Sequence, residues 1–302
     1  MNTKLFYLHP GFKNKYISFG LGLLSRAFCL PRLFKFSNLL QSQLWKSGYI
    51  RAVNYHDIPS ESSASFEAQL SFFRKYFTDV SLQDLDSFID TGVWSKDRPG
   101  LMLCFDDGLR SSYTVAAPLL EKYGYRGWFF IPTQFIDVPA SLQKAYAMEH
   151  LIDFYEDYPD GRIAMSWEEI KELDKNHVIV SHTRNHVRLR PGLQKEILKR
   201  EILGSKADLE QILDHKIECF GWVGGELTSY DRIAAKFICE SGYRFSFLTK
   251  SGPILPWTSR YQLHRTFLGP DWPSGIVQLH LSGILDVLYY PQRKRINRMT
   301  SV

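Results

Sequence analysis

Two aspartates stand side by side directly after a short apolar run, in the stretch LCFDDG at positions 103–108. Adjacent carboxylates repel each other, so a strand that ends in Asp106 and Asp107 needs a positive charge nearby. A divalent cation would supply that charge, because it could bind one aspartate as a ligand while the other stays free as a base. On its own, an Asp-Asp-Gly triplet is more often a turn or a helix cap.

Two histidines follow a second apolar run, in the stretch VIVSHTRNH at positions 178–186. The spacing of His182 and His186 brings both imidazoles to one side of a single turn, about 5–6 Å apart at Cβ. One carboxylate and two imidazoles make a three-ligand metal site with open positions, which is typical of catalytic rather than structural zinc sites. Each motif is weak alone, but both follow predicted buried strands, and together they indicate a metal-dependent reaction centre.

Short apolar runs alternate with amphipathic stretches along most of the chain, which predicts a parallel sheet or barrel of the α/β class. Seven or eight such units suit a β/α barrel, whose functional groups lie at the carboxyl ends of its strands. The strands are expected at 49–59, 100–105, 126–132, 177–182, 217–222 and 244–249, and the helices at 63–77, 81–92, 111–125, 166–176, 193–216 and 229–243.

These motifs resemble those of the polysaccharide deacetylase family, the NodB-homology group of carbohydrate esterases. The family's first motif, T-F-D-D-G, appears at 104–108 with Cys104 in place of the threonine, and its second, H-[ST]-x-x-H, appears at 182–186. The lead-in NYHDIP at 54–59 is similar to a strand of one branch of the family, and the resemblance covers roughly residues 50–285. It implies an irregular (β/α) barrel of the NodB-homology type.

The resemblance also implies a role for each matched residue. Asp106 becomes the catalytic base, and Asp107, His182 and His186 become the ligands of a divalent metal, most often zinc. The implied reaction removes an acetyl group from an N- or O-acetylated saccharide, with a metal-bound water as the nucleophile.

The sequence departs from the family at the third motif, which normally offers an arginine and a proline. The stretch CFGWVGGE at 219–226 has neither, so the partner that orients the base is left open. Trp222 is either a wall of the sugar pocket or a core residue. Gly224 either brings a backbone N–H close to the substrate or simply makes a turn.

The family's fifth motif, Leu-x-His, supplies a general acid and has no exact match here. His56 and His264 are the candidates for this role. His56 is preferred because it ends a strand at the rim that carries the predicted ligands. His280 falls in a predicted helix and is interpreted as structural.

The basic charge is concentrated at the start of the chain. Residues 1–51 carry a net charge of +8 with no acidic residue, so the remainder is −3, which argues against a nucleic-acid-binding protein. We therefore expect three parts: a basic, apolar, helical extension at 1–48, a catalytic domain at 49–290 and a basic tail at 291–302.

The extension suits a helix on an anionic membrane surface, although a packing helix or a cleaved signal gives the same pattern. Its apolar runs are shorter than the roughly 20 residues of a membrane span. Four scattered cysteines favour a reducing compartment. We expect a cytoplasmic protein at the inner face of the membrane that acts on a lipid-linked saccharide, with export as the alternative.

Two other functions fit the same residues. One is a hydrolase of a different carbon–nitrogen bond, or a deformylase, with the same metal site. The other is a glycan-binding protein without activity, which the missing arginine would allow. Retention of all four charged or metal-binding residues argues against the second, because such a cluster is costly without a cation. The sequence gives no indication of the oligomeric state.

Overall fold

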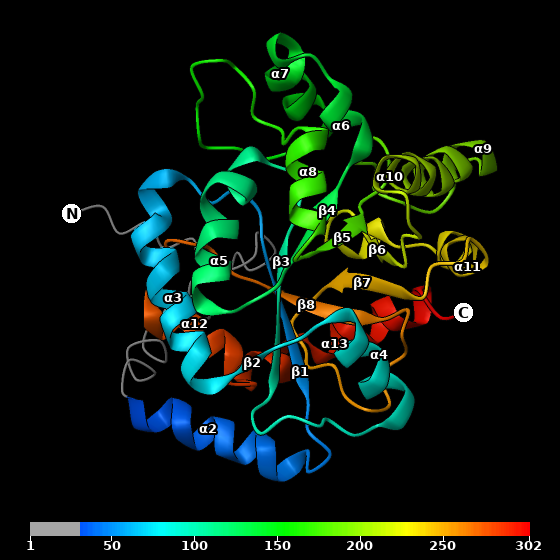
Figure 1. Cartoon of the computed structure of the whole chain (residues 1–302). Helices are drawn as coiled ribbons and strands as arrows, with labels where there is room; N and C mark the ends of the chain where they lie inside the picture. The colour runs from blue at the N-terminus through cyan, green and yellow to red at the C-terminus, as the bar shows by residue number, and fades with distance from the viewer. Residues whose placement is uncertain (1–30) are drawn as a thin grey trace, which may run out of the picture.

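The computed structural model describes residues 31–302, and a sheet of eight parallel strands forms its centre (Figure 1). β1 pairs with both β8 and β3, so seven strands close into a ring, and the short β2 pairs only with the start of β3. This arrangement confirms the predicted (β/α) barrel. The strands are β1 (Ile50–Tyr55), β2 (Thr78–Asp79), β3 (Gly100–Phe105), β4 (Gly127–Ile131), β5 (Val178–Ser181), β6 (Cys219–Gly221), β7 (Phe245–Thr249) and β8 (Leu263–Phe267).

Helices cover the outside of the ring (Figure 1). Single π-helical turns, Ser112–Ala116 and Arg200–Gly204, lead into α5 and join α9 to α10. The helices are α2 (Pro31–Leu44), α3 (Ser63–Tyr76), α4 (Leu82–Thr91), α5 (Ala117–Tyr123), α6 (Thr133–Asp137), α7 (Ala140–His150), α8 (Trp167–Asp174), α9 (Lys195–Lys199), α10 (Ser205–Leu213), α11 (Arg232–Glu240), α12 (Ser274–Leu281) and α13 (Ile284–Met299).

Local sequence signals explain where several helices begin and end. Ser81 and Ser166 each cap a helix through a capping box, in which the serine accepts the N–H of the third helical residue and that residue's carboxylate accepts the serine N–H. Gly92 ends α4 with a φ of 71°, a left-handed conformation that favours glycine. Each capping box joins residues only three positions apart, Ser81 with Asp84 and Ser166 with Glu169. The sequence predicts both helices, α4 and α8, correctly.

The strands place alternate residues in two separate apolar cores. Met102 and Cys104 of β3 pack inside the barrel, whereas Leu103 and Phe105 pack between the barrel and the helices. Every residue of β1 and β3 is buried. Burial on both faces explains why the run at 100–105 is continuously apolar rather than alternating.

The carboxyl-terminal part of the chain departs from the sequence expectation. The sequence analysis assigned no strand at 263–267, because its middle residues are polar, yet β8 closes the ring there. α13 runs across the expected domain boundary at 290, so the basic tail is the second half of a helix. Residues 1–30 of the predicted extension lie outside the described residues. Within the described range, no helix combines the length and apolarity that a membrane span requires.

Side chains of β8 point alternately into and out of the barrel. Arg265 points inward and lies over the Phe130 ring at 4.0 Å, whereas His264 points outward to α13. His264 is 3% exposed, and its Nε2 lies 2.7 Å from Oδ1 of Asn297. Burial lowers the pKa of His264 to about 3.

We predict that His264 makes the protein sensitive to acid. Between the ordinary imidazole pKa near 6.5 and about 3, the unfolded chain binds a proton that the folded chain cannot. Lowering the pH in this range should therefore reduce the free energy of unfolding by up to ~1.4 kcal/mol per pH unit for this group. Urea unfolding between pH 7 and 5 should give a shallower pH dependence for His264→Gln. The matched variant His215→Gln, at an exposed imidazole, should not flatten it, and equal slopes for wild type and His264→Gln would contradict the prediction.

Candidate active site

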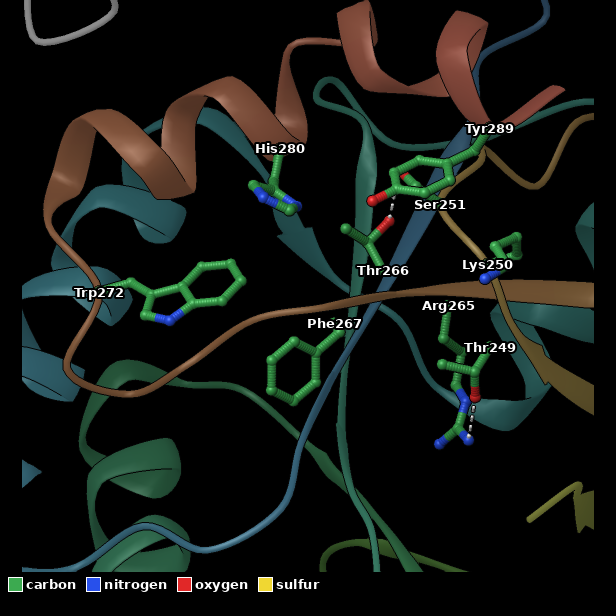
Figure 2. A pocket seen from close by; sticks show the side chains of 9 residues that line it. All are labelled: Thr249, Lys250, Ser251, Arg265, Thr266, Phe267, Trp272, His280 and Tyr289. Carbon is green, nitrogen blue, oxygen red and sulfur yellow. Dashed lines mark hydrogen bonds between the residues drawn. The ribbon is translucent and has the colours of Figure 1, made fainter. Parts of the chain in front are cut away.

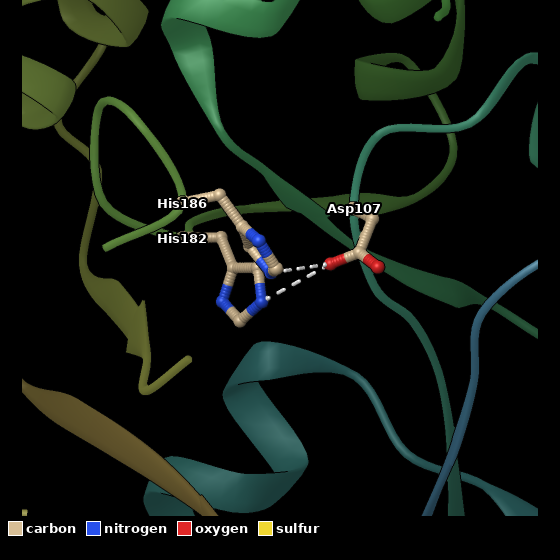
Figure 3. Close-up of side chains that lie close together, drawn as sticks. All are labelled: Asp107, His182 and His186. Carbon is tan, nitrogen blue, oxygen red and sulfur yellow. Dashed lines mark ion pairs between the residues drawn. The ribbon is translucent and has the colours of Figure 1, made fainter. Parts of the chain in front are cut away.

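The predicted reactive residues meet at the carboxyl ends of three strands. Asp106 and Asp107 follow β3, His182 follows β5, and His56 follows β1. His186 reaches the same place from the loop after β5 (Figure 3). Parallel strands bring these residues to one rim of the barrel although the sequence separates His56 from His186 by 130 positions.

Asp107, His182 and His186 lie close enough together to share a metal ion. Oδ1 of Asp107 lies 2.9 Å from Nε2 of His186 and 3.5 Å from Nε2 of His182 (Figure 3). One ligand atom from each residue falls within 4.8 Å of the others, and Asp107 is 1% exposed.

Backbone carbonyls orient both imidazoles towards Asp107. Nδ1 of His182 lies 3.0 Å from the carbonyl of Gly221, and Nδ1 of His186 lies 2.7 Å from the carbonyl of His150. A carbonyl can only accept, so each Nδ1 donates its proton there, and Nε2 of each ring faces the cluster.

The cluster fits a divalent cation. Oδ1 of Asp107 is buried and accepts no hydrogen bond from the described residues, while two imidazole Nε2 atoms point at it. Three electron-rich atoms converge there and require positive charge, either as protons on the rings or as a metal ion. Burial acts to raise the pKa of Asp107, but His186 and His56 hold it well below its usual value, so the carboxylate is ionised.

The loop that carries the two histidines has an unusual backbone. Thr183 and His186 have φ values of 61° and 53°, in the left-handed region that non-glycine residues rarely adopt. Glu201, fully buried in the π-helical turn, holds this loop: its Oε2 accepts the backbone N–H groups of Arg184 and Asn185, at 3.1 and 2.8 Å. The sequence analysis missed Glu201, because a glutamate in an amphipathic helix normally faces solvent.

Arg265 is the second residue that the sequence analysis missed. Its Nη1 lies 2.5 Å from Oδ1 of Asp106, and both side chains are buried. Asn54 of β1 donates to Oδ2 of Asp106 at 3.1 Å. Burial acts to raise the pKa of Asp106, but Arg265 outweighs it, and the pKa lies below its usual value. Arg265, from β8, is thus the partner of Asp106 that the sequence analysis left open.

His56 lies at the edge of this cluster, as expected for a residue of the rim. Its Nε2 lies 3.9 Å from Oδ2 of Asp106 and 4.0 Å from Oδ2 of Asp107. The side chain is 35% exposed and packs against Phe267. It is therefore the candidate general acid that contacts both the carboxylates and solvent.

His264, by contrast, does not belong to the site. Its side chain points out of the barrel to Asn297, because the alternation along β8 assigns the inward position to Arg265. The sequence analysis did not recognise β8 as a strand, so it could not assign His264 to the inner or the outer face of the barrel.

Trp222 is a core residue rather than a wall of the sugar pocket. It is 1% exposed, its Nε1 donates to Oγ of Ser246 at 2.8 Å, and its rings contact Tyr230. Gly224 lies in the loop after β6 with a φ of 83°, and a Cβ there would come within 2.6 Å of Oγ of Ser229. The turn therefore requires glycine, and a role of Gly224 in substrate binding remains a prediction.

A small cavity lies beside the site, between β8 and the helices α12 and α13. Figure 2 shows Lys250, Thr266 and Tyr289 around it, with Trp272 and His280 further along the same wall. His280 is buried with its ring 4.9 Å from that of Trp272. This position agrees with the interpretation of His280 as structural.

Comparison with known proteins agrees with the geometry. The sequence model of the family described as polysaccharide deacetylase matches residues 95–245, half of the chain. This chain belongs to the polysaccharide deacetylase family. As a member it is a hydrolase that acts on carbon–nitrogen bonds other than peptide bonds.

Two curated relatives of this deacetylase are bacterial proteins. YxkH of Bacillus subtilis, named as a polysaccharide deacetylase, is 24% identical over 226 residues, which are 72% of this chain and 70% of YxkH. The poly-beta-1,6-N-acetyl-D-glucosamine N-deacetylase of Escherichia coli K12 is 21% identical over 160 residues, or 49% of this chain. That match spans only 22% of the E. coli protein.

Solved structures share the fold of this deacetylase. PplD of Streptococcus pyogenes, solved in complex with acetate, superposes with a TM-score of 0.62 at 16% identity, over 78% of this chain and 97% of PplD. IcaB of Ammonifex degensii superposes with a TM-score of 0.60 at 19% identity, over 78% of this chain and 97% of IcaB. At these identities the likeness shows a common barrel.

We predict that Arg265→Met strongly destabilises the deacetylase, because it leaves the buried Asp106 carboxylate without its counter-charge. The expected loss is about 3–5 kcal/mol in the free energy of unfolding at pH 7. The difference in the free energy of unfolding between wild type and Arg265→Met should become smaller as the pH falls, because the unpaired Asp106 carboxylate of the variant can take up a proton. Urea unfolding tests this. The control is Arg110→Met, at the more exposed pair with Asp160, where a loss below about 1 kcal/mol is expected. Equal losses would contradict the role of Arg265.

We predict that Glu201→Gln weakens zinc binding about 10- to 100-fold, because it weakens the acceptor that holds the loop between His182 and His186. Zinc competition with a chromogenic chelator measures the dissociation constant. Glu196→Gln, at an exposed glutamate of the same helical segment, is the control and should bind zinc as the wild type does. An unchanged constant in Glu201→Gln would show that the loop holds its shape without this carboxylate.

Proposed function

We propose that this deacetylase removes the acetyl group from an N-acetylated saccharide with the help of a divalent metal ion, most often zinc. The observation that carries the proposal is the convergence of Asp107, His182 and His186 beside the buried Asp106–Arg265 pair. The E. coli relative, named for an N-acetyl-D-glucosamine polymer, supports an amide rather than an ester as the bond that breaks.

Asp107, His182 and His186 would hold the metal ion. When bound, the ion supplies Lewis-acid polarisation of the acyl carbonyl and lowers the pKa of water near it. The protein contributes the orientation: the Gly221 and His150 carbonyls set both ring tautomers, and Glu201 holds the loop between the rings.

Asp106 suits the role of base. Its low pKa keeps it ionised, and Arg265 holds its Oδ1, so Oδ2 is directed towards Asn54 and His56. In the proposed reaction Asp106 accepts the proton of the water that attacks the acyl carbon. Asp107 is less suited to this role, because its Oδ1 faces the two imidazoles.

His56 suits the role of general acid. The bond between carbon and nitrogen breaks only if the departing amine receives a proton, and His56 is the half-exposed imidazole beside both aspartates. When His56 donates this proton, the carbon–nitrogen bond breaks, and acetate and the free amine of the sugar are the products. An O-acetylated sugar, a formylated substrate or another carbon–nitrogen bond could use the same groups, so product analysis decides among them.

A lipid-linked saccharide and a position at the cytoplasmic face of the membrane also belong to this proposal. The support is the composition of residues 1–48, which are basic and apolar with no acidic residue. A saccharide carried by a lipid would then be concentrated on the same surface as the enzyme.

We predict that the zinc-loaded protein releases acetate from N-acetylglucosamine oligomers and that Asp106→Asn lowers the rate about 10²- to 10⁴-fold. His56→Gln should lower it in the same range, whereas His264→Gln should retain it after correction for the folded fraction. Enzymatic assay of acetate and of free amine in equal amounts measures the reaction. Removal of the metal with a chelator should abolish it, and added zinc should restore it.

Two outcomes would contradict the proposed function. Release of formate or ammonia without acetate would assign a different carbon–nitrogen bond. Tight binding of the oligomer without release of any product, with zinc bound at one equivalent, would indicate a glycan-binding protein.

A further inference from the structure

Large apolar side chains are exposed mainly on two helices, α2 and α13. On α2, Leu33, Phe36, Leu40 and Leu44 follow each other at the spacing of one helix face, and Leu44 is 73% exposed. Ile284, Val287 and Leu288 form such a face on α13, with Val287 74% exposed. Nine of the 17 exposed large apolar residues of the described chain lie on these two helices, so the exposure is concentrated rather than scattered.

The two helices are neighbours in the fold. Gln41 of α2 donates to the carbonyl of Ser282 at 3.0 Å, directly before α13 begins. Arg51 of β1 binds both Gln41 and Asp286 of α13, in the buried interior between the helices. The end of α2 and the start of α13 are thus held together by Gln41 and Arg51. We call the exposed faces of these two helices the α2–α13 surface.

The charge on this surface has one sign. Its exposed cations are Lys35 and Lys46 at α2, and Lys294, Arg295 and Arg298 on α13. Neither helix has an exposed carboxylate: α2 contains no acidic residue, and Asp286 of α13 is buried against Arg51. By sequence, residues 1–30 that lead into α2 add four cations and no acid.

We propose that the α2–α13 surface docks the enzyme on an anionic lipid bilayer. Apolar side chains flanked by lysine and arginine are what a helix needs to lie in the interface of such a membrane. A second copy of this chain is the poorer occupant, because an isologous contact would bring cations against cations. A nucleic acid would leave the leucines and Phe36 without an apolar partner.

The two helices take different places on the barrel. Gln41 of α2 binds Arg51 near the start of β1, and in Figure 1 α2 lies at the lower edge and α7, whose last residue contacts His186, at the upper. α13 packs along the side of the barrel, where Asn297 contacts His264 on the outer face of β8. The α2–α13 surface therefore covers the amino-terminal end and one side of the barrel.

Co-sedimentation of the full-length protein with vesicles tests the docking. We expect binding to vesicles of equal phosphatidylglycerol and phosphatidylcholine, and at least tenfold weaker binding to phosphatidylcholine alone or at 0.5 M salt. Phe36→Ser/Leu40→Ser should weaken binding to the anionic vesicles at least tenfold, and Lys294→Gln/Arg295→Gln should weaken it as well.

The matched control is Leu142→Ser/Met148→Ser, which removes two apolar side chains from α7 near the active-site rim that are at least as exposed, on average, as Phe36 and Leu40. It should bind vesicles as the wild type does. All variants should melt at the same temperature and release acetate from a soluble oligomer at the same rate, so a failure of docking is distinguishable from a failure of the proposed function. Unchanged vesicle binding by Phe36→Ser/Leu40→Ser would overturn the proposal. So would a wild-type dimer that this variant abolishes, or duplex DNA binding as tight as vesicle binding.

Discussion

Two neighbouring carboxylates are buried at the end of β3, and the architecture of the site follows from the need to neutralise them. Asp106 and Asp107 are 3% and 1% exposed, so water cannot screen them. Arg265 provides positive charge for the first, and the His182–His186 pair offers a place for a cation beside the second. The two aspartates thereby acquire different environments, one held by a guanidinium and one facing imidazoles. Different environments are what allow adjacent, identical groups to take different roles in one reaction.

The sequence predicts the part of this site that local spacing encodes. Asp106, Asp107, His182 and His186 belong to short motifs at the ends of strands, and such motifs can be recognised without knowledge of the fold. Arg265 could not be found in this way, because β8 has polar residues at 264–266 and lacks the continuous apolar run that marks the other buried strands. The matched family region spans residues 95–245, so it begins after His56 and ends before Arg265.

The position of His264 follows from the register of its strand. Whether a strand residue faces the barrel interior depends on register, and shifting the register by one residue reverses the face. His264 and Arg265 are neighbours in sequence, yet one packs against Asn297 outside the barrel and the other holds Asp106 inside it. Trp222 follows β6 at the rim, but Ser246 and Tyr230 enclose it. Of the two alternatives that the sequence left open for Trp222, this enclosure favours core packing.

The position of β8 in the chain has a consequence for biosynthesis. Of the strands in residues 31–302, β8 is the last to leave the ribosome, and it both seals the ring between β7 and β1 and delivers the guanidinium to Asp106. A nascent chain that has reached only β7 therefore has two unsealed sheet edges and an uncompensated acidic pair. Pairing of Asp106 with Arg265 therefore coincides with closure of the ring, so the buried acidic pair is compensated only once the barrel is complete.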